Sequence, residues 1–160
     1  VKPSFIRVEA DELTYNLHIM LRFEIEQDLI EGKVQPEDLP ALWNRKMEEY
    51  LGITPKSDAE GVLQDVHWSF GAFGYFPTYT LGNLYSVQFF DQAKLEIPRL
   101  EDEIAAGQLL ELRRWLGQKI HRWGRTFTPD HLARRVTGAT ISPDPFLSYV
   151  EKKYGEIYQL

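Results

Sequence analysis

The sequence predicts an all-α protein, and three observations lead to this fold class. Apolar residues recur every three or four positions through most of the chain, which is the period of an amphipathic helix. Prolines and glycines stand at the starts and ends of these segments, where helices favour them. Strand patterns are few, and only residues 61–68 (GVLQDVHW) could hold a short strand. The chain has 160 residues, enough for a hydrophobic core, so we expect residues 1–160 to form a single helical domain or fragment.

Residues 11–31 and 36–51 predict the first two helices. The first segment has an apolar face at helical spacing, formed by Leu13, Leu17, Met20, Leu21 and Ile25. Gly32 follows it directly, as glycine commonly does after a helix. Pro36 opens the second segment, with acidic residues in its first turn, and Gly52 ends it.

The middle of the chain predicts a loop and then an apolar helix. Residues 53–77 read mostly as loop, with a short helical turn at 59–64. Residues 78–95 predict a third helix that is rich in aromatic residues and almost free of charge before Asp91. Because a helix that apolar is typical of a protein interior, we expect it to be buried on most sides.

The last third of the chain predicts the remaining helices. Residues 99–124 predict one helix, or two with a break at Gly107. Thr128, followed by proline, predicts the start of a fifth helix because threonine caps and proline is favoured in the first turn. Residues 144–158 predict the sixth.

Composition excludes several classes of function. The net charge is −6, which disfavours a nucleic-acid partner because phosphate binding needs a basic surface. No apolar run is long enough to cross a membrane, and no signal-peptide pattern is present. The sequence has no cysteine, hence no disulfides or thiolate ligands, which fits a cytoplasmic location. The first residue is Val1, so we expect the chain to be a piece of a longer protein.

Polar residues form one stripe along the first predicted helix. The stripe steps by three and four residues through Arg7, Asp11, Tyr15, His18 and Arg22, with Thr14 beside it, and Arg7 stands at its mouth if it precedes the helix proper. It could be a solvated face. However, solvated faces are usually built of lysine and glutamate, whereas this stripe consists of directional hydrogen-bonding groups. An arginine fork suits bidentate binding of a carboxylate, and Asp11 could hold Arg7 in place or neutralise it.

The histidines do not form a recognisable metal site. None of the four belongs to an HExxH zinc motif, so we expect no metal ligands in this chain. His121 and His131 are interpreted as surface or helix-end residues. His67 stands in the loop before a glycine-rich aromatic segment, where a structural histidine is the commoner outcome.

The segment FGAFGYFPTYTLGN, residues 70–83, is either a packed corner of the core or the wall of a binding site. Its glycines favour close approach of a backbone, and its rings would be exposed in a plain loop. For Phe70, Phe73 and Phe76 we favour simple core packing.

With IRVEAD at residues 6–11 and GYFP at residues 74–77, in this order, the sequence resembles the carboxypeptidase Taq family of metallocarboxypeptidases. The surrounding segments of residues 9–26, 65–83 and 134–154 also resemble the C-terminal third of that family. The resemblance therefore covers essentially the whole chain.

The resemblance implies a metal-dependent enzyme, of zinc type, that removes single residues from the C-terminus of peptides. It also implies the C-terminal helical part of a two-lobed fold similar to neurolysin, and a homodimer. In the family the HExxH segment precedes these motifs, and this chain does not contain it. The chain alone is therefore predicted to be inactive, and zinc or another divalent metal is expected only in the complete enzyme.

The same resemblance assigns roles to individual residues. Arg7 matches the arginine that holds the terminal carboxylate of the substrate, with Asp11 beside it. Tyr75 matches a tyrosine that can donate a hydrogen bond to the oxyanion. Tyr79 and His67 are further candidates for that role.

Two other functions stay open from the residues. The chain could be a non-catalytic helical binding module that kept a carboxylate pocket or works with a partner carrying HExxH. It could also be a structural or dimerisation domain, in which case the apolar third helix would form the interface and Arg7 would lie away from any pocket.

Overall fold

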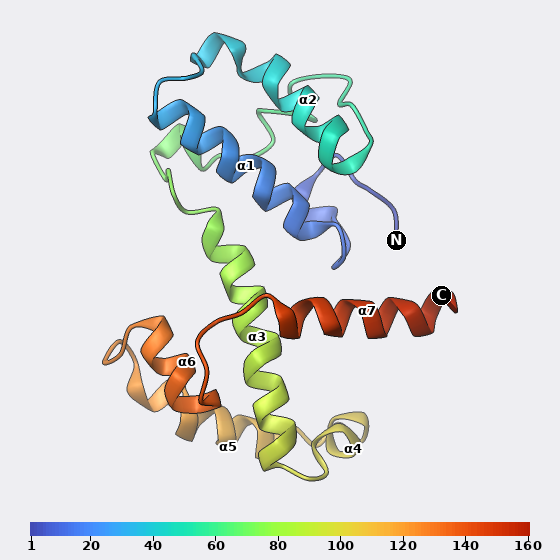
Figure 1. Ribbon diagram of the computed structural model, residues 1–160, viewed down its shortest axis with the longest axis vertical. Coiled ribbons are helices and arrows are strands. Elements are labelled where there is room, and N and C mark those ends of the chain that lie inside the picture. Colours follow the sequence, from blue (N-terminus) through green and yellow to red (C-terminus); the bar gives the residue numbers. More distant parts are fainter. The chain divides into compact units, whose positions relative to one another are not determined.

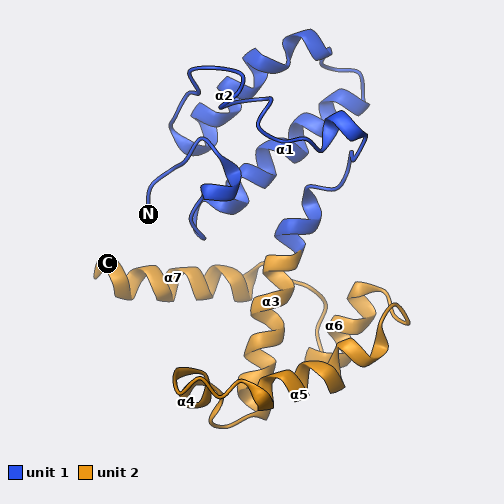
Figure 2. Ribbon diagram, turned by 180° about the vertical axis from the view of Figure 1, so that it is seen from behind, with its two compact units in different colours: residues 1–81 blue, residues 82–160 orange.

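The computed structural model describes all of residues 1–160 and contains helices but no strands (Figure 1). The predicted all-α class is confirmed, and the short strand expected at residues 61–68 is wrong. Residues 61–63 lie in turns, with a hydrogen bond from the N–H of Gln64 to the carbonyl of Gly61, and Trp68 begins a 3₁₀ helix. The chain divides into two compact units, residues 1–81 and 82–160, shown in different colours in Figure 2.

The first unit is built on two helices, α1 (Tyr15–Ile30) and α2 (Leu39–Leu51), which pack against each other. Three short 3₁₀ helices accompany them: η1 (Arg7–Glu9), η2 (Pro36–Asp38) and η3 (Trp68–Phe70). Gly52 ends α2 in the left-handed conformation, with φ of 67°, as the sequence predicts.

The core of the first unit lies between α1 and α2. Its buried members are Leu21, Ile25, Leu42, Trp43, Met47 and Leu51. Burial of about 1.5–3 kcal/mol per large apolar side chain is the main stabilising contribution here. The loop after α2 adds Val62 and Trp68 to the edge of this core, which brings residues 62–68 against α1 and α2.

The second unit holds most of α3 (Pro77–Glu96) and the last four α-helices. These are α4 (Leu100–Ala105), α5 (Leu110–Lys119), α6 (Pro129–Thr137) and α7 (Asp144–Tyr158), with η4 (His121–Trp123) between α5 and α6. The predicted break at Gly107 is confirmed, because this residue has φ of 72° between α4 and α5. The core of the second unit consists of Ala93, Leu100, Trp115 and Val136.

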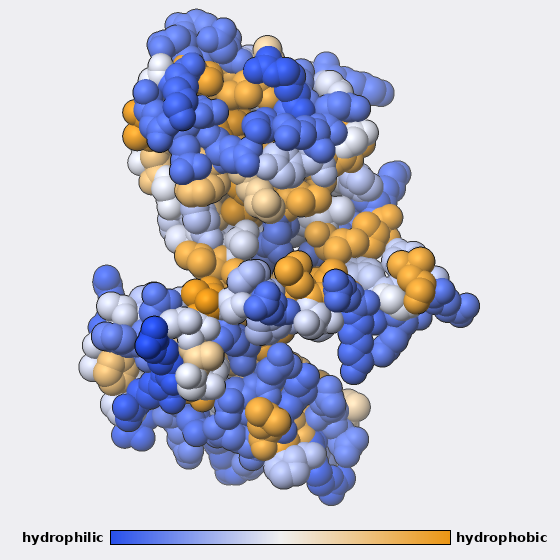
Figure 3. All heavy atoms as spheres, viewed as in Figure 1, coloured by the Kyte–Doolittle hydropathy of each residue, from blue (hydrophilic) through white to orange (hydrophobic).

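The expected burial of the third helix on most sides is wrong. Of the residues in α3, only Gln88 and Ala93 are buried. Most other residues of α3 are partly buried, and Leu81, Phe90 and Leu95 are exposed. Figure 3 shows hydrophobic side chains at the surface in several groups among hydrophilic ones.

No helix of the chain is both long and apolar enough to span a membrane. The expectation that residues 1–160 form a single helical domain or fragment stays a prediction. The structure itself divides into the two compact units described above.

Candidate functional site

Two arginines share one carboxylate in the first unit. Arg7 donates to Asp65 Oδ1 from Nη2 at 2.7 Å and from Nε at 3.2 Å. Arg22 donates to Asp65 Oδ2 from Nε at 2.7 Å, and its Nη2 lies 2.6 Å from the same oxygen. Each oxygen of Asp65 is therefore matched to one guanidinium. We call these three residues the arginine–aspartate cluster.

Three separate segments position this cluster. Arg7 lies on η1, Arg22 in the middle of α1, and Asp65 in the loop after α2. The side chain of Gln64 joins two of the segments, because it accepts from the backbone N–H of Arg7 at 2.9 Å and donates to the carbonyl of Phe5 at 2.8 Å. The loop therefore fixes both the side chain and the backbone around Arg7.

The guanidinium groups are otherwise held by neighbours from α1. Arg7 Nη1 donates to the hydroxyl of Tyr15 at 3.0 Å, and Arg22 Nη1 donates to the carbonyl of His18 at 2.8 Å. Arg22 is fully buried and Arg7 nearly so. The interpretation of this stripe as a solvated helix face is wrong, because these side chains point into the first unit.

Burial and charge shift the pKa values of the cluster. Burial alone would raise the pKa of Asp65, but the hydrogen bond from Arg7 and the two positive charges outweigh it and hold that pKa below its ordinary value. Burial lowers the pKa of Arg22 to about 10, despite the opposing effect of Asp65. Burial also opposes the charge of Arg7, but the bond and charge of Asp65 raise its pKa above the ordinary value. All three groups are charged at neutral pH, so the cluster has a net charge of +1.

His18 lies fully buried beside this positive charge. Neither of its ring nitrogens makes a hydrogen bond of good geometry. Burial, together with the charges of Arg22 and Arg7, lowers the pKa of His18 to about 4. The ring is therefore neutral at physiological pH and leaves the charge of the cluster unbalanced.

Asp11 lies apart from the Arg7 guanidinium. Its carboxylate accepts from the backbone N–H and the hydroxyl of Thr14, at 2.9 and 3.1 Å, and from the backbone N–H of Lys2 at 2.9 Å. These bonds hold Thr14, the residue directly before α1, and tie Lys2 to the same carboxylate. The expectation that Asp11 holds or neutralises Arg7 is wrong, because the Arg7 guanidinium forms its ion pair with Asp65.

A group of aromatic rings borders the cluster. Phe76 is 1% exposed, and its ring centre lies 5.9 Å from the Arg7 guanidinium and 4.6 Å from the centre of the His67 ring. Tyr79 lies 5.0 Å from the Arg7 guanidinium, and its hydroxyl is 3.1 Å from His67 Nε2. The predicted residues Arg7, His67 and Tyr79 are therefore brought together by the fold.

Tyr75 completes this group but is far more accessible. Its side chain is 49% exposed, stacks on His67 with ring centres 5.7 Å apart, and meets the ring of Tyr79 edge-on at 5.4 Å. Burial raises the pKa of the Tyr79 phenol, which keeps this group protonated at neutral pH. The arrangement offers an exposed phenol and a partly buried phenol–imidazole pair beside a positive charge.

Core packing holds for only one of the three phenylalanines. Phe76 is buried, whereas Phe70 is 66% exposed and Phe73 43% exposed. Phe70 directly precedes Gly71 and Phe73 directly precedes Gly74, and both glycines adopt a positive φ, 79° and 78°. The segment is thus both a packed corner, at Phe76, and an accessible wall.

The remaining histidines lie at the surface, as predicted for His121 and His131. No group of three or more histidine, cysteine, aspartate or glutamate side chains in the chain could hold a metal ion.

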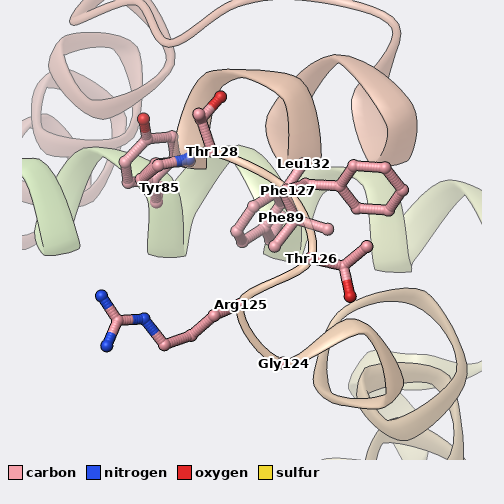
Figure 4. A pocket seen from close by; sticks show the side chains of 9 residues that line it. Tyr85, Phe89, Gly124, Arg125, Thr126, Phe127, Thr128 and Leu132 are labelled. Carbon is pink, nitrogen blue, oxygen red and sulfur yellow. The ribbon is translucent and has the colours of Figure 1, made fainter.

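The second unit contains a separate cavity of about 600 Å³ (Figure 4). Tyr85, Phe89, Phe127 and Leu132 contribute its apolar lining. The side chain of Arg125 extends away from these rings in Figure 4. None of the residues predicted for the site lines this cavity.

Sequence reasoning missed Asp65 and Gln64. Each has a partner that comes from a distant segment, so its role depends on tertiary contacts. The one available signal was the occurrence of Gln64 and Asp65 inside a largely apolar stretch, where polar side chains need a bonding partner.

Comparisons with known proteins identify the family of the chain. The family model described as carboxypeptidase Taq (M32) metallopeptidase matches residues 1–154. Thermostable carboxypeptidase 1 of Thermus thermophilus is 52% identical over 99% of this chain, and carboxypeptidase 1 of Bacillus subtilis is 45% identical over 99% of it. The M32 carboxypeptidase structure from Deinococcus radiodurans superimposes with a TM-score of 0.96 at 43% identity over the whole chain.

The fold and the family match point to one family of metallopeptidases. The chain belongs to the carboxypeptidase Taq (M32) family. It spans about a third of the length of these relatives, 31% of the Thermus protein and 32% of the Deinococcus structure. The metal ion that such a family implies has no ligand set among residues 1–160.

Proposed function

We propose that this chain is the C-terminal, substrate-anchoring part of a metal-dependent carboxypeptidase that releases single residues from the C-terminus of peptides. The family match supports the class of enzyme. In this proposal the metal ligands come from polypeptide outside residues 1–160, and the metal, zinc or another divalent ion, activates the attacking water. Residues 1–160 alone would then be inactive.

The arginine–aspartate cluster is the observation that carries the proposal. Two guanidinium groups share a single carboxylate next to a neutral histidine, so a buried positive charge lacks a counter-ion. A terminal carboxylate supplies the missing charge and can bind in bidentate fashion. Arg7 is the better placed of the two, because Arg22 is fully buried and Arg7 uses three of its five N–H groups in the bonds described.

The aromatic group would act on the peptide carbonyl. Tyr75 is exposed and has no hydrogen bond from its hydroxyl to the chain, so we assign it as the first candidate for the oxyanion donor. Tyr79 and His67 form a bonded pair and are the second candidates. Asp11 would act on substrate binding only through the start of α1, since its carboxylate is occupied by Thr14 and Lys2.

The first test uses the polypeptide extended upstream to the length of the relatives. We expect this form to bind metal and to cleave peptides with a free C-terminus, and to leave C-terminally amidated peptides intact. If residues 1–160 alone bind metal and cleave peptides, the assignment of an incomplete site is wrong.

Arg7→Ala in the active, extended protein tests the anchor. Loss of a charge-assisted bond to substrate predicts a fall in kcat/KM of about 10- to 100-fold for free-acid peptides, and a smaller preference for the free acid over the amide. Arg99→Ala is the control, because the side chain of Arg99 is exposed to solvent. Unchanged kinetics and unchanged preference would contradict the carboxylate role of Arg7.

A helical binding or dimerisation module is the second candidate, favoured by exposed apolar side chains on α3 and α7. These include Leu81, Phe90, Leu95, Leu147 and Ile157. We propose that the partners are a second copy of the protein, which forms a homodimer, and the C-terminus of a peptide. Nucleic acid and membrane have no role in this proposal, and the protein works in the cytoplasm. Light scattering of the extended protein, with and without substitution of Leu147, tests the dimer.

A further inference from the structure

A buried glutamate ties the aromatic loop to α1. Glu26 lies one turn after Arg22 on α1 and is buried. Its Oε1 accepts from the indole N–H of Trp68 at 2.9 Å, and its Oε2 accepts from the backbone N–H of Gly74 at 3.2 Å. No lysine or arginine forms an ion pair with it. Each oxygen of this buried carboxylate therefore has one neutral donor, and both donors belong to the same loop.

A carboxylate is needed for this pair of bonds. Burial of polar oxygens without partners is costly, and it is tolerated here because one N–H group is directed at each oxygen. A glutamine of the same size could accept only one of the bonds, because its amide nitrogen would face the other N–H. The loop is therefore held by two acceptor oxygens that a glutamine could not supply.

The two bonds enclose the flexible part of the loop. Gly71 and Gly74 both have positive φ. Glycine adopts this conformation freely because it has no Cβ, so the backbone here is not restricted by a side chain. Trp68 is further held by edge-on contacts with Trp43 and Phe76, at 6.1 and 6.0 Å between ring centres. Between Trp68 and Phe76, the bond from Gly74 to Glu26 is the anchor to a helix.

Tyr75 depends on that anchor. It follows Gly74 directly, is 49% exposed, and has no hydrogen bond from its hydroxyl to the chain. Its place is set by the backbone of the loop and by ring contacts with His67 and Tyr79. A loop released at Gly74 would leave the ring of Tyr75 free to move relative to Arg7.

We propose that Glu26 is a positioning residue, which holds the loop of residues 68–74 so that Tyr75 and His67 face the arginine–aspartate cluster. This proposal rests on the proposed carboxypeptidase function. It adds a residue that touches neither substrate nor metal and acts through Trp68 and Gly74.

The test is Glu26→Gln in the extended, metal-loaded protein, with rates divided by metal content. Misplacement of a transition-state donor predicts a fall in kcat of about 10- to 100-fold, with KM within about 2-fold of the unmodified protein. Hydrogen exchange at the amide of Gly74 should become faster in the same variant. A residue with only a structural role would lower the fraction of folded protein but leave kcat per metal site unchanged.

Glu24→Gln is the matched control. Glu24 lies on the same helix and also accepts two bonds, from Lys46 and Tyr50, but it does not contact the loop. Its substitution should leave kcat and exchange at Gly74 unchanged. Trp68→Phe is the second variant, because it removes one bond and keeps a ring, and it should lower kcat by a smaller factor if Glu26→Gln fails to fold.

The outcomes separate the two proposals. An unchanged kcat with faster exchange at Gly74 overturns the positioning role, and so does a lower kcat with unchanged exchange. If the unmodified extended protein cleaves no peptide, the proposed function fails and the catalytic part of this inference fails with it. Exchange at Gly74 then still decides whether Glu26 fixes the loop.

Discussion

Removal of the charge of Asp65 should destabilise the first unit strongly. Asp65→Asn keeps the size of the side chain but removes the counter-ion of two guanidinium groups, one of which is fully buried. It also turns an amide N–H₂ toward one arginine, where like donors oppose each other. Loss of one member of a buried ionic group costs about 3–5 kcal/mol, so we expect the free energy of unfolding to fall by that amount.

This loss should be visible in the melting temperature. For a domain of this size, each kcal/mol lost from the free energy of unfolding lowers the melting temperature by roughly 4–8 °C. We therefore expect the melting temperature of the first unit to fall by more than about 10 °C. Urea unfolding followed by tryptophan fluorescence measures the free energy, since Trp43 and Trp68 lie in this unit. Asp58→Asn is the matched control, because Asp58 is an exposed residue in the same loop and should change stability by less than about 0.5 kcal/mol.

The pH dependence gives a second, independent check. Because the pKa of Asp65 is below its ordinary value in the folded chain, its contribution is complete above the unfolded pKa of about 4 and is lost as the pH falls through the folded pKa. The asparagine variant should lack this acid-dependent part of the stability. A variant within about 1 kcal/mol of the unmodified chain, with the same acid profile, would refute the role of Asp65 as the shared counter-ion.

Three further predictions follow from neighbouring residues. The pKa of His18 is about 4 in the folded chain and about 6.5 when unfolded, so the free energy of unfolding should fall by about 3 kcal/mol as the pH drops from 6.5 to 4. Urea titrations of His18→Leu should lack this pH dependence, and an equal dependence would contradict the buried neutral ring. Phe76→Ala should lower the free energy of unfolding by about 3–5 kcal/mol, whereas Phe70→Ala should change it by less than about 0.5 kcal/mol, and equal losses would show that exposure does not separate the two rings. Tyr75→Phe in the extended protein should lower kcat more than it raises KM in steady-state assays, and an equal effect on both would indicate a packing role.

The helices were predictable because their signals are local. Periodic apolar residues, proline in first turns and glycine at ends act within one or two turns of the chain. The end of α2 at Gly52, the break at Gly107 and the start of α6 at Thr128 all lie where those signals predict them. The IRVEAD and GYFP segments likewise sufficed to predict the family, since ordered motifs are a property of the sequence alone.

The partners of the site residues were decided by tertiary structure. Spacing on one helix placed Arg7 near Asp11, but the fold brings Asp65 to it from 58 residues away. The same holds for Glu26, whose partners Trp68 and Gly74 lie 42 and 48 residues further along the chain. Helical period determines which residues share a face, whereas the identity of a buried charge's counter-ion depends on which distant loop packs against that face. The sequence by itself therefore determined the helices, the family and the kind of side chains in the site, and the packing of residues 62–76 against α1 decided how those side chains are paired.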